Sequence, residues 1–599
     1  MNQLEEKESL AVQVKNKMEQ EIKKLIKDAL QNLNIEVSEV VLEHPEDLKN
    51  GDYSTNIALS IAKEIGQNPR ELAEKIKEQI LRLNLDKYLE KIEVAGAGFI
   101  NFYLSRKFFA GSGEKIVNQA DNFGKNNLWE GKKVMVEYTQ PNPFKPFHIG
   151  HLMSNSIGES ISRLVEFSGA EVSRANYQGD VGLHVAKAIY GLLKNKKLQD
   201  KSGSHNMQAS NIGRAYAFGA GVYESDEQAK KEIDEINKKV YARDDKKINE
   251  IYEWGFATTM EAFEDLYKML GTKFDFYFLE SVMAQFGEEI VRANVGEIFE
   301  ESDPEPEQAR YGAGKAIIFR GEKYDPKLHT RVFITSQGLP TYEAKELGLT
   351  EEKFKTDPNM SLSIVVTANE QADYMKVVAK AVSLLHPEYE KRMKHVTHGM
   401  MRLPSGKMGS RKGNVVTGES LLADARLAVA EKMQDRELLE EEADKIISDV
   451  GVAAVKYSIL KQRIGGDILY DAEKSISFEG DSGPYLQYSY ARANSVLEKA
   501  QKENILPDPH AFPPEIFEVE KLLYKFPEIV RRSMEEYEPH YIANYLIEIA
   551  RAFNSFYGNT IIVNKEDKTS PYKVALTYAF SFVMKNGLHL LGIQAPRKM

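Results

Sequence analysis

The stretch KVMVEYTQPNPFKPFHIGH, residues 133–151, decides the fold of this chain of 599 residues. It begins with a short apolar, β-rich run, continues through a loop punctuated by three prolines, and opens an apolar-periodic segment from Ile149 to Ser168 that stops at Gly169. A second β-rich run follows at residues 171–176. Strand, loop, helix and strand in this order are typical of a parallel nucleotide-binding sheet.

The sheet pattern resumes later in the chain, which predicts one Rossmann-type α/β domain over residues 125–420. Its further strand-like runs lie at residues 316–319, 332–335, 362–367 and 395–401. Residues 192–299, between the early and late runs, are heavily charged and have helical periodicity. We therefore expect a parallel-sheet domain that is interrupted by a mostly helical insertion.

Both flanks of this domain have patterns of their own. Residues 1–110 combine an amphipathic helix with a second helix opened by Asn68-Pro69 and a glycine-bent pair of strands, which predicts a small α+β domain. Residues 421–599 read as helical almost throughout, with long amphipathic segments beyond about residue 480. Three units in this order are the expected organisation.

Composition excludes several classes of protein. Hydrophobic residues make up 42% and charged residues 28% of the chain, as in ordinary globular proteins. The absence of cysteine excludes disulfides, thiolate zinc sites and cysteine nucleophiles. An acidic N-terminus and the lack of a long apolar run predict a cytoplasmic protein with no membrane partner. The net charge of −11 gives no reason to expect a DNA partner.

Two histidines mark the start of the helix that follows the first strand. His148 and His151 are three residues apart and flank Gly150. Imidazole N–H groups at a helix N-terminus can hold a phosphate chain and its developing charge, and glycine lets a nucleotide approach the backbone. A histidine pair at this spacing without a third ligand makes a poor zinc site, so no protein-bound metal is expected.

A glycine-rich basic loop forms a second candidate phosphate site. The run LPSGKMGSRKGN, residues 403–414, follows a strand pattern and carries three cations within six residues, Lys407, Arg411 and Lys412. Such a loop is suited to close over a triphosphate. Either segment alone is also explained as surface histidines or a solvated basic loop. Their joint presence after an early and a late strand of one sheet favours nucleotide chemistry.

Together the two segments resemble the signature motifs of class I aminoacyl-tRNA synthetases, and their surroundings resemble arginyl-tRNA synthetases. The resemblance is weakest over residues 192–299 and is carried by residues 137–151, 176–180, 339–347 and 590–599, with N-terminal runs at 51–53 and 96–101. It implies a ligase that activates L-arginine with ATP, accompanied by Mg²⁺, and transfers the arginine to tRNA(Arg). The N-terminal domain is implied to contact the tRNA elbow, and the C-terminal helices its anticodon.

The resemblance also implies roles for individual residues. The ATP-binding and catalytic groups are His148, Gly150, His151, Lys407, Met408, Ser410, Arg411 and Lys412. The arginine pocket is formed by Glu137, Asn142, Tyr342, Glu346 and Gln371. Carboxylates and amides suit a guanidinium and an α-amino group. Glu346 stands where the family pattern has Asp, which lengthens the arm by one methylene.

One departure from the family pattern concerns the basic loop. Ser410 occupies the place of the second lysine of that loop in most relatives. Lys145, three residues before His148, is implied to supply the missing positive charge from the other side of the phosphates. We therefore count Lys145 among the catalytic residues.

The sequence leaves three alternative functions open. A small-cofactor adenylyltransferase shares the histidine motif, but such enzymes are much shorter. Another class I synthetase fits less well, because there is no thiolate zinc site and the insertion is too short for an editing domain. An inactive tRNA-binding paralogue would not need the intact residues His148, His151, Lys145 and Lys407.

Overall fold

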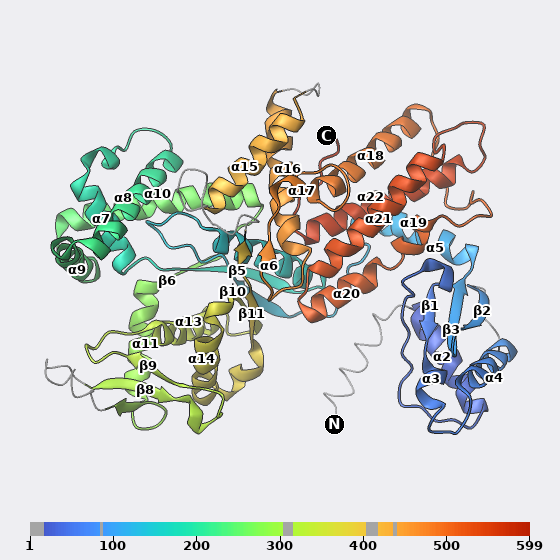
Figure 1. Ribbon diagram of the computed structural model, residues 1–599, viewed down its shortest axis with the longest axis horizontal. Coiled ribbons are helices and arrows are strands. Elements are labelled where there is room, and N and C mark those ends of the chain that lie inside the picture. Colours follow the sequence, from blue (N-terminus) through green and yellow to red (C-terminus); the bar gives the residue numbers. More distant parts are fainter. Residues whose placement is uncertain (1–16, 84–87, 303–314, 403–416, 435–439) are drawn as a thin grey trace.

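A parallel sheet of five strands forms the centre of the protein (Figure 1). The computed structural model describes residues 17–83, 88–302, 315–402, 417–434 and 440–599. The strands, in spatial order, are β11 (Met393–His398), β10 (Met360–Ala368), β4 (Lys133–Glu137), β5 (Glu171–Gln178) and β6 (Phe276–Leu279). All neighbouring pairs are parallel, which confirms the predicted Rossmann-type α/β class. Strand β4 is central, so the loop after it leaves the sheet at the point where the strand order reverses.

Helices on either side connect the strands. The first crossover helix, α6 (Ile149–Phe167), runs between β4 and β5. Four helices with a core of their own form the projecting lobe next to β6 in Figure 1: α7 (Leu183–Lys194), α8 (His205–Ser225), α9 (Glu227–Ala242) and α10 (Lys246–Leu270). Three more helices pack near the sheet after it: α11 (Glu280–Ala293), α13 (Tyr342–Thr356) and α14 (Ala372–Leu385).

Two details of the expected sheet domain were wrong. Residues 192–299 are mostly helical, as expected, but they are not all an insertion, because β6 lies within that range and pairs with β5 in the central sheet. A strand of only four residues gives too little periodicity to be separated from its helical neighbours. The runs at 316–319 and 332–335 form β8 (Ala316–Arg320) and β9 (Thr330–Ile334) of a separate antiparallel sheet with β7 (Glu300–Ser302). The short link between β8 and β9 cannot make a parallel crossover.

The N-terminal part is the expected small α+β domain. Its elements are α2 (Lys17–Asn32), β1 (Tyr53–Thr55), α3 (Ile57–Ile61), α4 (Pro69–Arg82), β2 (Leu89–Ala95) and β3 (Phe99–Leu104). The strands form an antiparallel sheet in the order β1-β3-β2. As predicted, Asn68 caps α4: its Oδ1 accepts a hydrogen bond from the N–H of Arg70 at 2.9 Å. Helix α5 (Arg106–Gln119) leads from this domain to the sheet.

The C-terminal part is helical, also as predicted. Its helices are α15 (Gly418–Lys432), α16 (Glu440–Leu460), α17 (Ala472–Ser475), α18 (Gly483–Lys502), α19 (Glu518–Leu523), α20 (Phe526–Glu536), α21 (His540–Asn559) and α22 (Ser570–Leu590). One hydrophobic core joins several of them to α6 and to β4 and β10 of the sheet. No helix in the described ranges has the length and apolar composition to cross a membrane.

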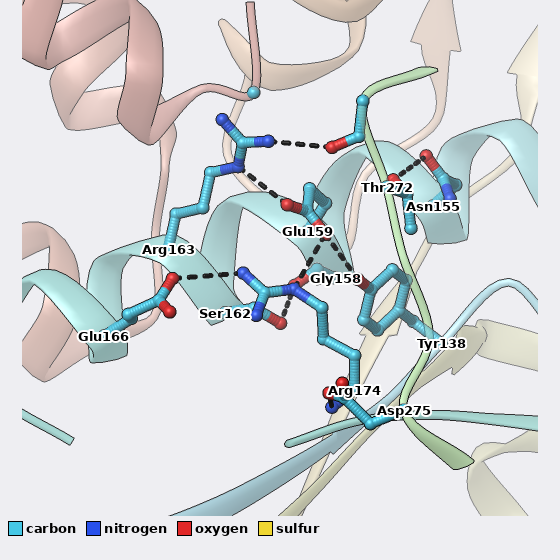
Figure 2. Close-up of polar contacts among 12 residues, drawn as sticks. Tyr138, Asn155, Gly158, Glu159, Ser162, Arg163, Glu166, Arg174, Thr272 and Asp275 are labelled. Carbon is cyan, nitrogen blue, oxygen red and sulfur yellow. Dashed lines mark hydrogen bonds and ion pairs between the residues drawn. The ribbon is translucent and has the colours of Figure 1, made fainter. Parts of the chain in front are cut away.

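Helix α6 lies at the junction of these parts, and sixteen of its nineteen residues are buried. Its Glu159 carboxylate is almost fully buried and accepts hydrogen bonds from Tyr138 Oη, Arg163 Nε and Arg174 Nε (Figure 2). Close approach of Tyr138 requires Gly158, because a Cβ there would lie 2.2 Å from the tyrosine ring. Burial of the carboxylate is therefore matched by three donors, as a buried charge requires.

Two cations at this junction hold the ends of two helices. Arg163 donates to the carbonyls of Gly271, just after α10, at 2.8 Å and of His589 in α22 at 3.0 Å. The buried Lys456 of α16 donates to Leu270 O at 2.6 Å and Gly592 O at 2.9 Å. The carbonyls at the C-terminal ends of α10 and α22 lack partners within their helices, so these N–H donors satisfy them.

The Lys456 ammonium predicts a pH-dependent stability. Burial lowers the pKa of Lys456 to about 7, whereas the unfolded lysine titrates near ~10.4. Between these values the unfolded chain binds a proton that the folded chain has released, so the lysine contributes increasing stability as the pH rises. From pH 7 to 9, the free energy of unfolding should rise by about 1–2 kcal/mol relative to a Lys456→Met variant.

Denaturant unfolding of both proteins at the two pH values measures this difference. Lys499→Met removes an exposed lysine of α18 and serves as the control, with no pH-dependent difference from the parent protein. A constant difference between the parent and Lys456→Met would contradict the prediction.

Candidate active site

The two histidines of the HxGH segment, residues 148–151, cap the first turn of α6 by reciprocal hydrogen bonds. His148 is the N-cap, and its Nδ1 accepts the N–H of His151 at 3.4 Å. In return His151 Nδ1 accepts the N–H of His148 at 3.2 Å. The two rings are stacked with centroids 3.4 Å apart. This reciprocal cap, the imidazole counterpart of a capping box, fixes both rings at the helix N-terminus.

These contacts determine the protonation of both rings. Burial lowers the pKa of His148 to about 4 and the pKa of His151 well below its usual range, and the positive charge of Lys145 adds to both shifts. Both rings are therefore neutral near pH 7. Since each Nδ1 accepts a backbone hydrogen bond, each ring carries its proton on Nε2. The helix N-terminus thus offers two fixed N–H donors together with its own positive dipole end, which suits a phosphate chain.

The loop between β4 and α6 has an unusual backbone. Thr139, Gln140 and Phe144 adopt positive φ angles of 79°, 51° and 67°. Such conformations cost on the order of 1–3 kcal/mol each and persist where the surroundings enforce them. Here α6 holds the loop: Ser154 Oγ accepts the N–H of Thr139, and Asn155 Nδ2 donates to Thr139 Oγ1, both at 3.0 Å. The loop is therefore rigidly placed over the carboxyl edge of the sheet.

Lys145 lies in this loop and is half-buried. Its Nζ is 5.4 Å from the ring centroid of Tyr216 in α8, so the helical insertion covers it. Burial and the nearby charge of Lys187 lower the pKa of Lys145. Its positive charge helps to lower the pKa of both histidines of the HxGH segment.

The predicted basic loop is the run of residues 403–414. Its residues Lys407, Met408, Ser410, Arg411 and Lys412 lie outside the described residues. The chain is described again from Thr417, which forms a β-bridge with His148. The N–H of Gly418 donates to Phe147 O at 2.8 Å, and the Glu419 carboxylate accepts the N–H of Phe147 at 3.3 Å. The chain from Thr417 onward is thus attached directly beside the HxGH segment.

A cluster of carboxylates lies at the carboxyl edge of the central strands. Glu137, the last residue of β4, is fully buried and accepts hydrogen bonds from Lys353 Nζ at 2.7 Å and Gln140 Nε2 at 2.6 Å. Glu346 of α13 has no hydrogen bond or ion pair to its carboxylate among the described residues. Burial, followed by repulsion from Glu137, raises the pKa of Glu346 to about 8. An unpaired acid with a raised pKa, next to a second acid, is suited to receive a cation.

The comparisons with known proteins identify the family. Residues 114–471 match the family model "tRNA synthetases class I (R), catalytic domain". Residues 20–104 match "Arginyl tRNA synthetase N terminal domain", and residues 486–599 match "DALR anticodon binding domain".

The chain belongs to the arginyl-tRNA synthetase family.

Similar proteins cover the full length of this synthetase. The arginine–tRNA ligase of Clostridium perfringens is 29% identical over 589 residues, which is 96% of this chain and 100% of that protein. The ligase of Fusobacterium nucleatum is 31% identical over 92% of this chain and 93% of that protein. The structure of Thermus thermophilus arginyl-tRNA synthetase covers 97% of this chain and 100% of its own, with a TM-score of 0.76 at 23% identity. The last comparison shows that the fold is shared.

The remaining residues predicted for the synthetase pocket are Tyr342, Gln371 and Asn142. Tyr342 is the first residue of α13 and is 69% exposed, one turn before Glu346. Gln371 accepts a hydrogen bond from Tyr374 Oη at 2.6 Å, and Tyr374 lies within the electrostatic field of Glu346. Asn142 Oδ1 accepts the N–H of Gly179 at 3.2 Å. The pocket roles of these residues remain predictions.

Several residues of this cluster were missed by sequence reasoning. They are Gln140, Lys353, Tyr374 and the ion pair Lys345–Glu280, whose Nζ–Oε1 distance is 2.6 Å. Only Lys353 had a usable signal, because it follows Glu346 by seven residues and so lies on the same face of the helix. Gln140, Lys345 and Tyr374 are close in sequence to predicted residues, but no local pattern shows which partners their side chains bind.

The reciprocal cap allows the catalytic and structural roles of the histidines to be separated. His148→Asn and His151→Gln keep a side-chain oxygen that accepts the capping N–H but lose the Nε2 donor. We expect each variant to lower arginine-dependent exchange of ATP and pyrophosphate by about a hundredfold, because one donor to the developing charge is lost. Thermal unfolding should change little. Exchange at the parental rate in both variants would show that neither imidazole serves the activation step.

Proposed function

We propose that this arginine–tRNA ligase forms arginyl-adenylate between the HxGH segment and the carboxylate cluster, and transfers the arginine to tRNA(Arg). The observation that carries the proposal is the presence, at the two ends of the loop between β4 and α6, of the unpaired Glu346 carboxylate near Glu137 and of a rigid helix N-terminus with two neutral imidazole donors. The first suits a guanidinium, and the second suits a triphosphate. Both open onto the carboxyl edge of one parallel sheet, where such folds bind ligands.

The proposed activation step uses each group in a different way. The α-carboxylate of arginine attacks the α-phosphorus of ATP, and pyrophosphate leaves. His148 and His151 donate through Nε2 to phosphate oxygens and stabilise the charge that develops there. Lys145, from the loop before them, meets the charge on the departing pyrophosphate together with Lys407, Arg411 and Lys412. Magnesium accompanies ATP in this proposal and is held by the phosphates.

Glu346 holds the guanidinium in this proposal, while Asn142 and Gln371 accept the α-amino group and Tyr342 covers the side chain with its ring. Glu137 forms the base of the pocket below Glu346. Arginine requires a planar, fixed pair of acceptors, which an ammonium ion cannot use equally well. Selection of arginine over lysine follows from this geometry.

Two further proposals concern the cell and the tRNA. We place the enzyme in the cytoplasm with the other components of protein synthesis. Transfer to tRNA is supported by the match of residues 486–599 to an anticodon-binding domain. There the guanidinium of Arg492 lies 4.7 Å and 4.9 Å from the rings of Tyr488 and Tyr557, a combination suited to stacking on bases.

The role of Glu346 is tested with Glu346→Gln. The variant keeps the size of the side chain and removes the charge, so we expect arginine affinity to fall by a factor of about ten to a hundred, as for loss of a charge-assisted hydrogen bond. ATP affinity should remain within about twofold. Calorimetric titration measures both. Glu352→Gln, on the same helix, is the matched control and should bind arginine like the parent. Unchanged arginine affinity in Glu346→Gln would place this residue outside the pocket.

The role of Lys145 is tested with Lys145→Ala alone and combined with Ser410→Lys. The single variant should activate arginine more slowly with little change in arginine affinity, because the lost interaction is made mainly in the transition state. The added lysine should restore part of the rate, since it returns a cation to the phosphates. Single-turnover adenylate formation measures the step. A single variant as fast as the parent would show that Lys145 takes no part.

A further inference from the structure

A buried lysine lies beneath the proposed arginine pocket and takes no part in the roles assigned so far. The Lys353 side chain is only 3% exposed, and its Nζ is 2.7 Å from Oε2 of Glu137, which is fully buried. The other oxygen of Glu137 accepts a hydrogen bond from Gln140 Nε2. Both oxygens of Glu137 are therefore engaged before any substrate arrives.

Helix α13 carries both this lysine and the unpaired acid. Glu346 and Lys353 are seven residues apart, which is two helical turns, so both project from the face that meets the end of β4. Lys353 is bonded to Glu137, and Glu346 has no partner among the described residues. The positive charge of Lys353 thus pairs with Glu137 and also acts on Glu346, so one cation offsets two carboxylates.

Other charged groups around these three side chains are already paired or neutral. Lys345, the second lysine of this face, binds Glu280 at 2.6 Å. Tyr177 of β5 and Tyr374 of α14 face both carboxylates as neutral phenols, because burial raises the pKa of each. Burial lowers the pKa of His395 in β11 to about 4, so it is also neutral. Within the described part of the pocket, Lys353 is the cation that offsets Glu137 and Glu346.

We propose that Lys353 is a positioning residue for arginine recognition: it occupies Glu137 as an internal ion pair and leaves Glu346 as the acceptor for the guanidinium. The proposal rests on the arginine pocket proposed above. Without Lys353, two carboxylates would compete for one proton or for the substrate cation. With it, the pocket holds one net negative charge, which matches one guanidinium.

This arrangement has a specific electrostatic consequence. Arginine binds to ionised Glu346, so its affinity should increase as the pH rises toward the pKa of this group, about 8, and then level off. Loss of Lys353 removes a nearby positive charge and should move the midpoint of this rise to higher pH. Loss of the Glu137 charge should move the midpoint to lower pH. A lysine that only supported the fold would not produce shifts of opposite sign.

The experiment is calorimetric titration of the full chain with L-arginine between pH 6.5 and 9.5. The variants are Lys353→Met and Glu137→Gln, with Lys355→Met, which removes an exposed lysine of the same helix, as the matched control. We expect a midpoint about one pH unit or more higher for Lys353→Met, and lower by a similar amount for Glu137→Gln. Lys355→Met should match the parent. Titration of the α-amino group of arginine is common to all four proteins and cancels in the comparison.

Removing one partner of a buried ion pair is strongly destabilising, so the test of Lys353 also uses a variant without an unpaired buried charge. The double variant Glu137→Gln/Lys353→Met contains neither buried charge. Its midpoint should lie above that of Glu137→Gln alone, because a positive charge near Glu346 has been removed. Equal midpoints in these two proteins, or shifts of the same sign in the two single variants, would overturn the proposal.

Glu346→Gln separates this proposal from the pocket assignment. If that variant binds arginine as tightly as the parent, the pocket itself is misplaced. If it loses affinity and pH dependence while the midpoints of the Lys353 and Glu137 variants stay at the parental value, the pocket is correct and only the role of Lys353 fails.

Discussion

The burial of α6 is the constraint on which the rest of the structure depends. This helix packs against the sheet on one side and against the C-terminal helices on the other, within one hydrophobic core. A helix buried all round must satisfy every polar group it carries. Glu159 does so with three donors (Figure 2). Arg163 and Lys456 bind the ends of α10 and α22. The helix that begins at the HxGH segment therefore also joins the insertion and the C-terminal helices to the sheet.

The same rigidity explains the chemistry at the two ends of the site. At the N-terminus of α6, burial and reciprocal capping keep two imidazoles neutral with their Nε2 protons available. At the end of β4, burial brings two carboxylates into one field, and a single lysine offsets them. In the proposed function, the two imidazoles stay neutral when the substrate binds, whereas Glu346 changes its charge. Ionisation of Glu346 should accompany the binding of arginine.

Particular residues show what local patterns could and could not predict. The helix at 149–168, the strands around it and the cap at Asn68 follow from spacing, capping and proline rules that act within a few residues. Strand β6 was missed because four residues give too weak a signal, and β8 and β9 were assigned to the wrong sheet because strand patterns do not name their partners. Lys353 was missed for a related reason: its partner Glu137 is 216 residues away.

The sequence by itself determined most of the element types, the order of the domains and the HxGH segment, and it predicts the residue types of an arginine-binding pocket. These depend on local geometry, or on a resemblance carried by short contiguous motifs. Only the tertiary structure decided which strands pair, how α6 is surrounded, which nitrogen of each histidine carries the proton, and that Glu137 is already paired whereas Glu346 is not. The burial of a side chain and its charge partners depend on residues from distant parts of the chain. Both are therefore fixed only when folding brings those parts together.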